Sequence, residues 1–357
     1  MKKILQITLY PLSLIYYSIT YLRNKLYDWG IFASHEFKFP ILSIGNLSLG
    51  GTGKTPHTEY LVRLLKDKYN IATLSRGYKR KTKGFYSATK NSSYKDIGDE
   101  PLQYKSKFKN LTVAVDEKRV RGVSKILQGQ PQTEVIILDD AYQHRSISPG
   151  LNILITEYNN LYTDDCIFPS GRLRESKNGS KRAGIIIISK TPKDISKNEI
   201  RIVLQKINPL NQQKVFFTTI NYKELTPFTE KAKELNTTLK KEQTILLVTG
   251  IAKPNPLLQS LKNEYRNVHH IQFPDHHNFT SKDIKKIKNT FNQIEENNKF
   301  IISTEKDIMR LSLPEILKDI QDIPIFYIPI EVSFLDDERK EFDNLITEYV
   351  RKNKRNN

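Results

Sequence analysis

A glycine-rich segment near the amino terminus has the residue types and spacing of a phosphate-binding loop. It follows a predicted buried strand, 41–44, and opens a predicted helix, 54–66, as such a loop does. Glycines let backbone N–H groups approach phosphate oxygens at the start of a helix. The Lys54 ammonium would reach the β- and γ-phosphates of a nucleotide, and the Thr55 hydroxyl would bind Mg²⁺. The expected nucleotide-binding residues are Ser48, Leu49, Gly50, Gly51, Thr52, Gly53, Lys54 and Thr55.

A second segment supplies the carboxylates that a nucleotide site of this kind requires. The apolar run 135–138 ends in Asp139 and Asp140, and a strand end beside a phosphate loop is where Mg²⁺ is bound. We expect Asp139 to be the better Mg²⁺ ligand, with Asp140 and Gln143 near the metal or its waters. The two segments together predict an enzyme that uses a nucleotide.

The composition predicts a globular protein of two domains with anionic partners. The 357 residues are 38% hydrophobic and 27% charged, and the one cysteine, Cys166, excludes a disulfide framework and a cysteine-rich zinc site. The formal net charge of +18 favours a nucleic acid, a phosphorylated substrate or an acidic lipid surface. No helicase-like motif series or aromatic stacking platform is visible, so we expect no nucleic acid partner. No obligate protein partner is evident.

Apolar, β-branched runs alternate with helical segments, which predicts a doubly wound α/β fold with a mostly parallel, P-loop NTPase-like sheet. The predicted strands are 41–44, 71–74, 111–115, 135–138, 151–155, 185–188 and 215–220, followed after a polar stretch by 245–248, 268–273, 300–303 and 325–330. Further helices are predicted over 256–263 and 281–295. We expect the chain to divide into an amino-terminal helix, 1–30, a P-loop domain, 31–221, and a smaller α/β domain, 222–357, with the active site in the cleft between the two domains.

The amino-terminal segment predicts an amphipathic helix. Residues 4–22 carry no charge, and this length is borderline for a membrane span, which needs ~20 apolar residues. A full span is disfavoured by Pro11 and by a stripe of polar side chains at helical spacing. The stripe consists of Gln6, Tyr10, Ser13, Tyr17, Thr20 and Asn24. We expect a helix that lies in the membrane interface, and the alternative is a helix that packs on the protein's own core.

Seven motifs occur in order along the chain and carry a family resemblance. They are Gly50-Gly-Thr-Gly-Lys-Thr-Pro56, Ser75-Arg-Gly-Tyr78, Gly98-Asp-Glu-Pro101, Asp139-Asp-Ala-Tyr-Gln-His144, Phe168-Pro-Ser-Gly-Arg-Leu-Arg-Glu175, Phe273-Pro-Asp-His-His277 and Thr304-Glu-Lys-Asp307. The series resembles the tetraacyldisaccharide 4'-kinases, the lipid A kinases of Gram-negative bacteria. Ser48 fits, because the loop of this family typically starts with serine where the standard P-loop has glycine. Phe168 and Ser176 replace the usual leucine and proline.

The resemblance implies an ATP- and Mg²⁺-dependent kinase. Its substrate would be the 4'-hydroxyl of a tetraacylated glucosamine disaccharide 1-phosphate, and its product lipid IVA. The partners would be this anionic acylated lipid and the inner-membrane surface, with the protein peripheral or monotopic at the cytoplasmic face. The alternative is a membrane-associated P-loop ATPase that acts as a localisation switch. Leu49 counts against it, because some such ATPases have an extra lysine at this position.

The resemblance also implies roles for charged residues outside the loop. Arg174 would stabilise charge in the transition state or on the substrate phosphate, and Glu175 would contact the metal or its water. From the sequence alone, these two residues could equally form a surface ion pair. Substrate contacts are expected from Arg76, His144 and Arg172, although Arg76 could instead form a structural ion pair.

An Asp–His pair is implied for the acceptor hydroxyl. The resemblance assigns Asp99 as the catalytic base and His276 as the residue that orients or tunes it. We expect the pair to form only when the cleft is assembled, because the two residues lie in different predicted domains. The alternative for Asp99 is a helix cap. The role of Thr304–Asp307 stays open between a nucleotide contact and a helix cap.

Overall fold

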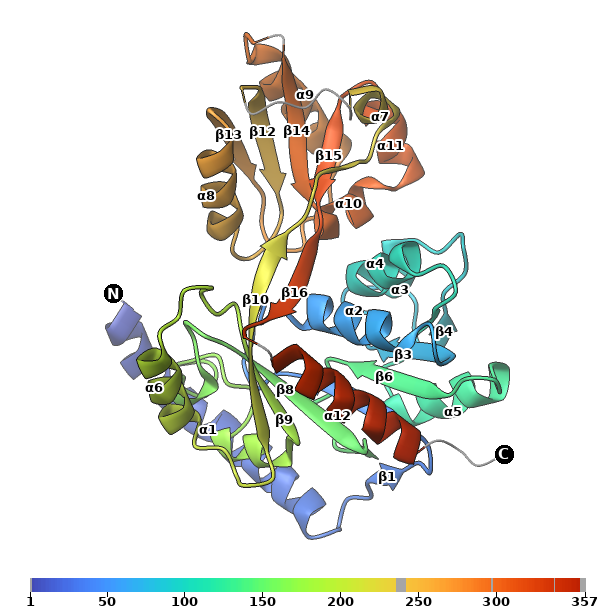
Figure 1. Ribbon diagram of the computed structural model, residues 1–357, viewed down its shortest axis with the longest axis vertical. Helices are drawn as coiled ribbons and strands as arrows, with labels where there is room; N and C mark the ends of the chain where they lie inside the picture. The colour runs from blue at the N-terminus through green and yellow to red at the C-terminus, as the bar shows by residue number, and fades with distance from the viewer. Residues whose placement is uncertain (1, 236–241, 297, 337, 354–357) are drawn as a thin grey trace. The chain divides into compact units, whose positions relative to one another are not determined.

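The computed structural model describes residues 2–235, 242–296, 298–336 and 338–353. The chain forms two units, both of α/β type (Figure 1). Unit 1 comprises Met1–Lys90, Tyr104–Asn221 and Val332–Asn357, and unit 2 comprises Asn91–Gln103 and Tyr222–Glu331.

Unit 1 is built on a nine-stranded sheet in the order β16-β10-β9-β8-β2-β6-β3-β5-β4. The strands from β10 to β5 in this order pair in parallel, and β4 pairs antiparallel with β5. The strands are β2 (Ile41–Gly45), β3 (Ile71–Ser75), β4 (Tyr86–Ser87), β5 (Thr112–Val115), β6 (Val135–Asp139), β8 (Leu151–Glu157), β9 (Ile185–Ser189), β10 (Lys214–Tyr222) and β16 (Ile330–Phe334), and a separate pair joins β1 (His35–Glu36) to β7 (Ile147–Ser148). The mostly parallel sheet is therefore confirmed.

Helices cover both faces of this sheet. Its helices are α1 (Lys2–Asp28), α2 (Lys54–Leu65), α5 (Arg119–Gly129), α6 (Lys197–Ile207), α12 (Glu338–Lys352) and the carboxyl half of α4 (Asp99–Lys107), with short 3₁₀ turns at 162–164 and 177–182. Successive strand residues point to opposite faces. Leu42 and Ile44 share a core with α2 and α12, whereas Ile41 shares a core with α5. This double cover explains why the central strands are continuously apolar.

Unit 2 has a five-stranded sheet in the order β11-β15-β14-β12-β13, parallel except for β11. Its elements are α3 (Tyr94–Ile97), β11 (Thr226–Pro227), α7 (Glu230–Leu235), β12 (Thr244–Thr249), α8 (Asn255–Glu264), β13 (Asn267–Gln272), α9 (Ser281–Gln293), β14 (Lys299–Thr304), α10 (Glu305–Leu311), α11 (Pro314–Ile320) and β15 (Ile325–Ile328). Ile301 shares a core with α9, α10 and α11, and Ile302 shares one with α7 and α8.

Two segments lie in a different unit from the one that the sequence predicts. The predicted strand 325–330 is divided at Pro329 into β15 of the unit 2 sheet and β16 of the unit 1 sheet. Proline lacks the N–H that a ladder requires, which favours a break at this position. The chain from Val332 onward belongs to unit 1, so the predicted second domain of 222–357 is divided between the two units. Residues 91–103, predicted in the P-loop domain, belong to unit 2.

Helix α1 contacts unit 1 through its polar side. Ser13 is 3% exposed and its hydroxyl donates to Ser170 Oγ at 2.8 Å, and Asn24 Nδ2 donates to Glu175 at 2.7 Å. Ile15 and Ile19, on the other side, are 59% and 62% exposed. A polar stripe was expected, and the structure turns much of it toward the protein and leaves the apolar side exposed.

The core position of α12 makes a prediction about stability. Phe342 is buried and its ring lies 5.3 Å from Phe216 and 4.6 Å from Phe334, centroid to centroid. Phe342→Ala should lower the free energy of unfolding of unit 1 by about 3–5 kcal/mol. Urea denaturation would measure the free energy of unfolding, and amide hydrogen exchange in β2 and β6 would show that the change affects unit 1. The exposed Lys340→Ala on the same helix is the control, and equal effects of the two variants would contradict the assignment of α12 to the core of unit 1.

Candidate active site

The glycine-rich loop connects the carboxyl end of β2 to the amino end of α2, as predicted. Gly50 and Gly53 have φ angles of +109° and +91°, in the left-handed region that favours glycine. Asn46 Nδ2 donates to the Thr52 hydroxyl at 2.9 Å, and the Ser189 hydroxyl at the end of β9 donates to the Thr52 carbonyl at 2.7 Å. The loop is thus held by its own side chains and by the neighbouring strand end.

The lysine of this loop contacts one carboxylate and shares it with an arginine. Lys54 Nζ lies 3.5 Å from Asp140 Oδ1, and Arg174 Nη1 lies 3.1 Å from the same oxygen. Burial raises the pKa of Asp140, but the charges of Lys54 and Arg174 outweigh burial and lower it to about 2. Asp140 is therefore an anion at neutral pH, placed between two cations that could bind phosphate oxygens.

Asp139 occupies a different environment from its neighbour. Its side chain is buried in unit 1, where the Tyr104 hydroxyl donates to Oδ2 at 2.8 Å and the Thr58 hydroxyl donates to Oδ1 at 3.5 Å. The sequence favoured Asp139 as the better Mg²⁺ ligand, whereas Lys54 forms its ion pair with Asp140.

Glu175 is buried among three donors. Gln143 Nε2 and Arg182 Nη2 donate to Oε1 at 3.0 and 2.8 Å, and Asn24 Nδ2 donates to Oε2. Gln143 Oε1 in turn lies 3.4 Å from Arg174 Nη1. Arg174, Gln143 and Glu175 are therefore brought together as one polar chain. In the described part of the chain, no three His, Cys, Asp or Glu side chains are grouped to hold a metal ion.

The three residues expected to contact substrate lie in different surroundings. Arg172 Nε donates to Asp165 at 2.9 Å and is ion-paired there. Arg76 is exposed and forms no ion pair with any residue that the structure describes. Burial, with the charges of Arg119 and Arg76, lowers the pKa of His144 to about 4, so this imidazole is neutral at neutral pH.

Two residues that position this site were missed by the sequence interpretation. Arg119 is fully buried, its Nη2 lies 3.4 Å from the Asp139 carbonyl, and burial lowers its pKa to about 10. His57 Nδ1 lies 2.7 Å from the Gly53 carbonyl, and burial lowers its pKa to about 4. The sequence did not mark either residue as part of the site. Arg119 is one of several charged residues close together in the sequence, and His57 is a single histidine in a predicted helix.

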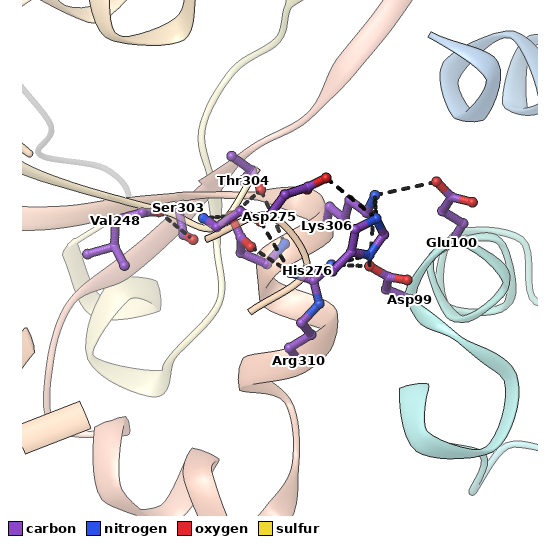
Figure 2. Close-up of polar contacts among 11 residues, drawn as sticks. Asp99, Glu100, Val248, Asp275, His276, Ser303, Thr304, Lys306 and Arg310 are labelled. Atoms are coloured by element: carbon purple, nitrogen blue, oxygen red, sulfur yellow. Dashed lines mark hydrogen bonds and ion pairs between the residues drawn. The ribbon is translucent and has the colours of Figure 1, made fainter. Parts of the chain in front are cut away.

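The predicted Asp–His pair is present, and both residues belong to unit 2. His276 Nδ1 lies 3.0 Å from Asp99 Oδ2, as Figure 2 shows. We expected the two residues to lie in different domains, and this was wrong, because residues 91–103 and His276 belong to the same unit. The backbone of His276 has a φ of +56° and its N–H donates to the Gly250 carbonyl at 3.1 Å, so the ring is presented from a fixed, left-handed turn.

The Asp99 carboxylate is surrounded by positive charge. Arg310 Nη2 donates to Oδ2, and Lys306 Nζ lies 3.9 Å from the same oxygen. Burial raises the pKa of Asp99, but the hydrogen bond from His276 and the charges of Lys306 and Arg310 outweigh it and hold the pKa well below its usual range. Asp99 is 4% exposed, and among the described residues no hydrogen bond reaches its Oδ1. Oδ2 is thus fixed by its partners, and Oδ1 is the oxygen that remains for a further contact.

Comparison with known proteins agrees with these features. The tetraacyldisaccharide-1-P 4'-kinase family matches residues 5–351. The tetraacyldisaccharide 4'-kinase of Phocaeicola vulgatus is 46% identical over 351 residues, covering 98% of this chain and 96% of the relative. That of Flavobacterium johnsoniae is 42% identical over 345 residues, covering 97% of each. The crystal structure of LpxK from Aquifex aeolicus in complex with ATP matches with a TM-score of 0.73 and 27% identity, covering 97% of this chain and 99% of that chain. The chain belongs to the tetraacyldisaccharide-1-P 4'-kinase family.

Proposed function

We propose that this protein transfers the γ-phosphate of ATP to the 4'-hydroxyl of a tetraacylated glucosamine disaccharide 1-phosphate, giving lipid IVA. The observation that carries the proposal is the contact of Lys54 and Arg174 with Asp140 beside the glycine-rich loop, in a chain of this family. The similar LpxK of Aquifex aeolicus was solved in complex with ATP. The family assignment does not favour the alternative of an ATPase that acts as a localisation switch.

The phosphate side of the reaction is assigned to unit 1. Backbone N–H groups of residues 48–53 and the Lys54 ammonium would bind the phosphates, and Arg174 would exchange part of its contact with Asp140 for a phosphate oxygen. Mg²⁺ is commonly bound by one or two carboxylates together with phosphate oxygens. Thr55, Asp139 and Asp140 offer this donor set, with Gln143 and Glu175 proposed near the metal waters. The ion would neutralise charge on the transferred phosphoryl group.

The acceptor side is assigned to Asp99. A sugar hydroxyl is a poor nucleophile at neutral pH, so a positioned base assists its attack. As the new O–P bond forms and the bond to ADP breaks, the hydroxyl proton would pass to Asp99 Oδ1, because Oδ2 is bound by His276 and Arg310. We retain Arg76, His144 and Arg172 as proposed contacts to the anionic lipid.

We propose that α1 places the protein at the cytoplasmic face of the inner membrane, peripheral or monotopic. Transfer of its exposed apolar side chains from water into the membrane interface is favourable in free energy. The exposed apolar residues of α1 are Ile7, Leu12, Leu14, Ile15, Ile19 and Leu22, and those just after the helix are Trp29, Ile31 and Phe32. Within the described residues, none of the helices has the length and apolar character to cross a membrane. A basic protein with such a surface suits a substrate that is both a lipid and an anion.

The first test removes the loop lysine. Lys54→Ala should lower kcat for transfer of labelled phosphate to the lipid at least about 100-fold, because a cation that stabilises transition-state charge is lost. The exposed Lys68→Ala on the turn after α2 should be unaffected. Near-normal transfer by a folded Lys54→Ala protein would refute the phosphate-loop assignment.

The second test concerns the base. Asp99→Asn should lower kcat by about 10²–10⁴-fold, and His276→Gln should have a milder effect. If the two residues act as a unit, the double variant should fall well short of the product of the single effects. Asn is preferred to Ala here, because Asp99 is the partner of the buried Arg310 and truncation would also destabilise the fold. Single effects on kcat that simply multiply would contradict the pairing.

The third test concerns the membrane. Ile15→Asp with Ile19→Asp should lower binding to anionic phospholipid vesicles at least ten-fold, because each fully buried side chain contributes roughly 1.5–3 kcal/mol. The KM for the lipid should rise and the KM for ATP should not. Ile202→Asp, at an isoleucine that is 44% exposed on α6, is the matched control. Unchanged vesicle binding of the double variant would remove α1 as the membrane contact.

A further inference from the structure

The segment from Thr304 to Arg310 has a fixed conformation that its place in the motif series left unexplained. Asp307 N donates to the Thr304 hydroxyl at 3.2 Å, which caps the start of α10. The Thr304 hydroxyl and Gly250 N both donate to Asp307 Oδ2, at 2.7 and 2.9 Å. A Cβ added to Gly250 would lie 2.9 Å from Asp307 Oδ1, so glycine is needed for this close approach. The helix start is therefore firmly attached to the end of β12.

Two cations project from this helix toward the Asp99–His276 pair (Figure 2). Lys306 and Arg310 are four residues apart, and on a helix such residues lie on one face. Lys306 Nζ lies 3.1 Å from His276 Nε2 and 3.4 Å from Glu100 Oε1. Arg310 is 2% exposed, and its Nη1 donates to Asp307 Oδ1 at 3.1 Å. Each member of the pair thus has its own cation: Arg310 for the carboxylate and Lys306 for the imidazole.

The contact of Lys306 determines which ring nitrogen carries the proton. Burial lowers the pKa of Lys306, but the charges of Glu100 and Asp99 outweigh it and raise this pKa above its ordinary value, so the side chain is an ammonium at neutral pH. An ammonium has three donors and no acceptor. A neutral His276 that accepts from this ammonium at Nε2 has its ring proton on Nδ1, where it is donated to Asp99 Oδ2.

The opposite tautomer of His276 is disfavoured at Nε2, where Lys306 lies. It would turn the Nε2–H toward the Lys306 ammonium, which lies 3.1 Å from Nε2, nearer than Asp275 Oδ2 at 3.8 Å. It would also turn a lone pair toward the Asp99 carboxylate. In that tautomer Nδ1 could accept from Arg310 Nη2, which lies 3.2 Å away, so the contacts of Nδ1 alone do not fix the position of the proton. The group that settles the tautomer is thus the lysine, because it meets Nε2, the nitrogen that faces away from the carboxylate.

We propose that Lys306 is a positioning residue for phosphate transfer: it fixes the Nδ1-protonated tautomer of His276, which in turn holds Asp99 Oδ2 and leaves Oδ1 for the acceptor hydroxyl. This inference rests on the proposed function for its kinetic consequence only. The tautomer itself is a property of unit 2 and can be measured without substrate.

The direct test is the tautomer of His276 in the full-length protein. Long-range ¹H–¹⁵N spectra of the ring nitrogens distinguish the two neutral tautomers, and the His276 signals are assigned by their loss in His276→Gln. The wild-type protein should show a protonated Nδ1 and an unprotonated Nε2. Lys306→Met should move both nitrogens toward values averaged over the two tautomers. Lys306→Arg keeps a cation that donates hydrogen bonds and cannot accept them, so it should retain the wild-type tautomer of His276.

The kinetic test uses the same variants. Lys306→Met should lower kcat about ten-fold, a part of the ~10²–10⁴-fold that a general base contributes, with the KM for ATP unchanged. Lys306→Arg should restore most of kcat. Lys285→Met, at an exposed lysine on α9 of the same unit, should match the wild type in both tests. Circular dichroism shows whether each variant is folded. If Lys306→Met does not fold, Lys306→Arg tests the inference, because loss of the wild-type tautomer pattern in this folded variant would contradict it.

The outcomes separate this inference from the proposed function. A wild-type tautomer in folded Lys306→Met, or a wild-type protein with its proton on Nε2, would overturn the positioning role. Absence of phosphate transfer by the wild-type protein, with the expected tautomer changes, would instead refute the kinase proposal and leave the effect of Lys306 on His276 supported.

Discussion

The buried guanidinium of Arg310, held between the carboxylates of Asp307 and Asp99, is the contact on which the proposed acceptor side of the site depends. Removal of one partner from a buried ion pair typically costs about 3–5 kcal/mol, because a charge is left without compensation. Asp307 is fixed by Gly250 and the start of α10, so Arg310 transmits a rigid position to Asp99. This fixation would favour proton transfer to Asp99, because the carboxylate needs no reorganisation when the acceptor hydroxyl binds.

Much of the fold was predictable, because buried parallel strands are continuously apolar and the runs at 135–138 and 185–188 are short and rich in β-branched residues, which favours strands. The path of the chain between the units was not predictable. Pro329 interrupts a run that reads as one strand, and only the packed structure shows that the two halves pair in different sheets. The polar stripe of α1 was visible as a pattern, but a pattern does not say which face meets the protein. Ser13, buried against Ser170, shows that it is the polar face.

The candidate site was predictable where a motif combines residue type with a strict local geometry. The glycine-rich loop is such a case, because Gly50 and Gly53 adopt left-handed angles that other residues avoid. The pairing of Asp99 with His276 came from family resemblance, since 177 residues separate them. Arg310 had no signal at all, because its role depends on burial, which appears only when the helix packs. Lys306 was visible within a motif, but its contact with a ring nitrogen is a property of the tertiary structure.

The central claim is that ATP cleavage is coupled to phosphorylation of a lipid hydroxyl. The most direct test is to measure ADP and lipid product together by ³¹P NMR, with purified protein, ATP, Mg²⁺ and tetraacyldisaccharide 1-phosphate. The account predicts one new phosphomonoester at the 4'-position of the lipid for each ADP formed, with little free phosphate. Formation of ADP and free phosphate with unmodified lipid would contradict it and would favour an ATPase.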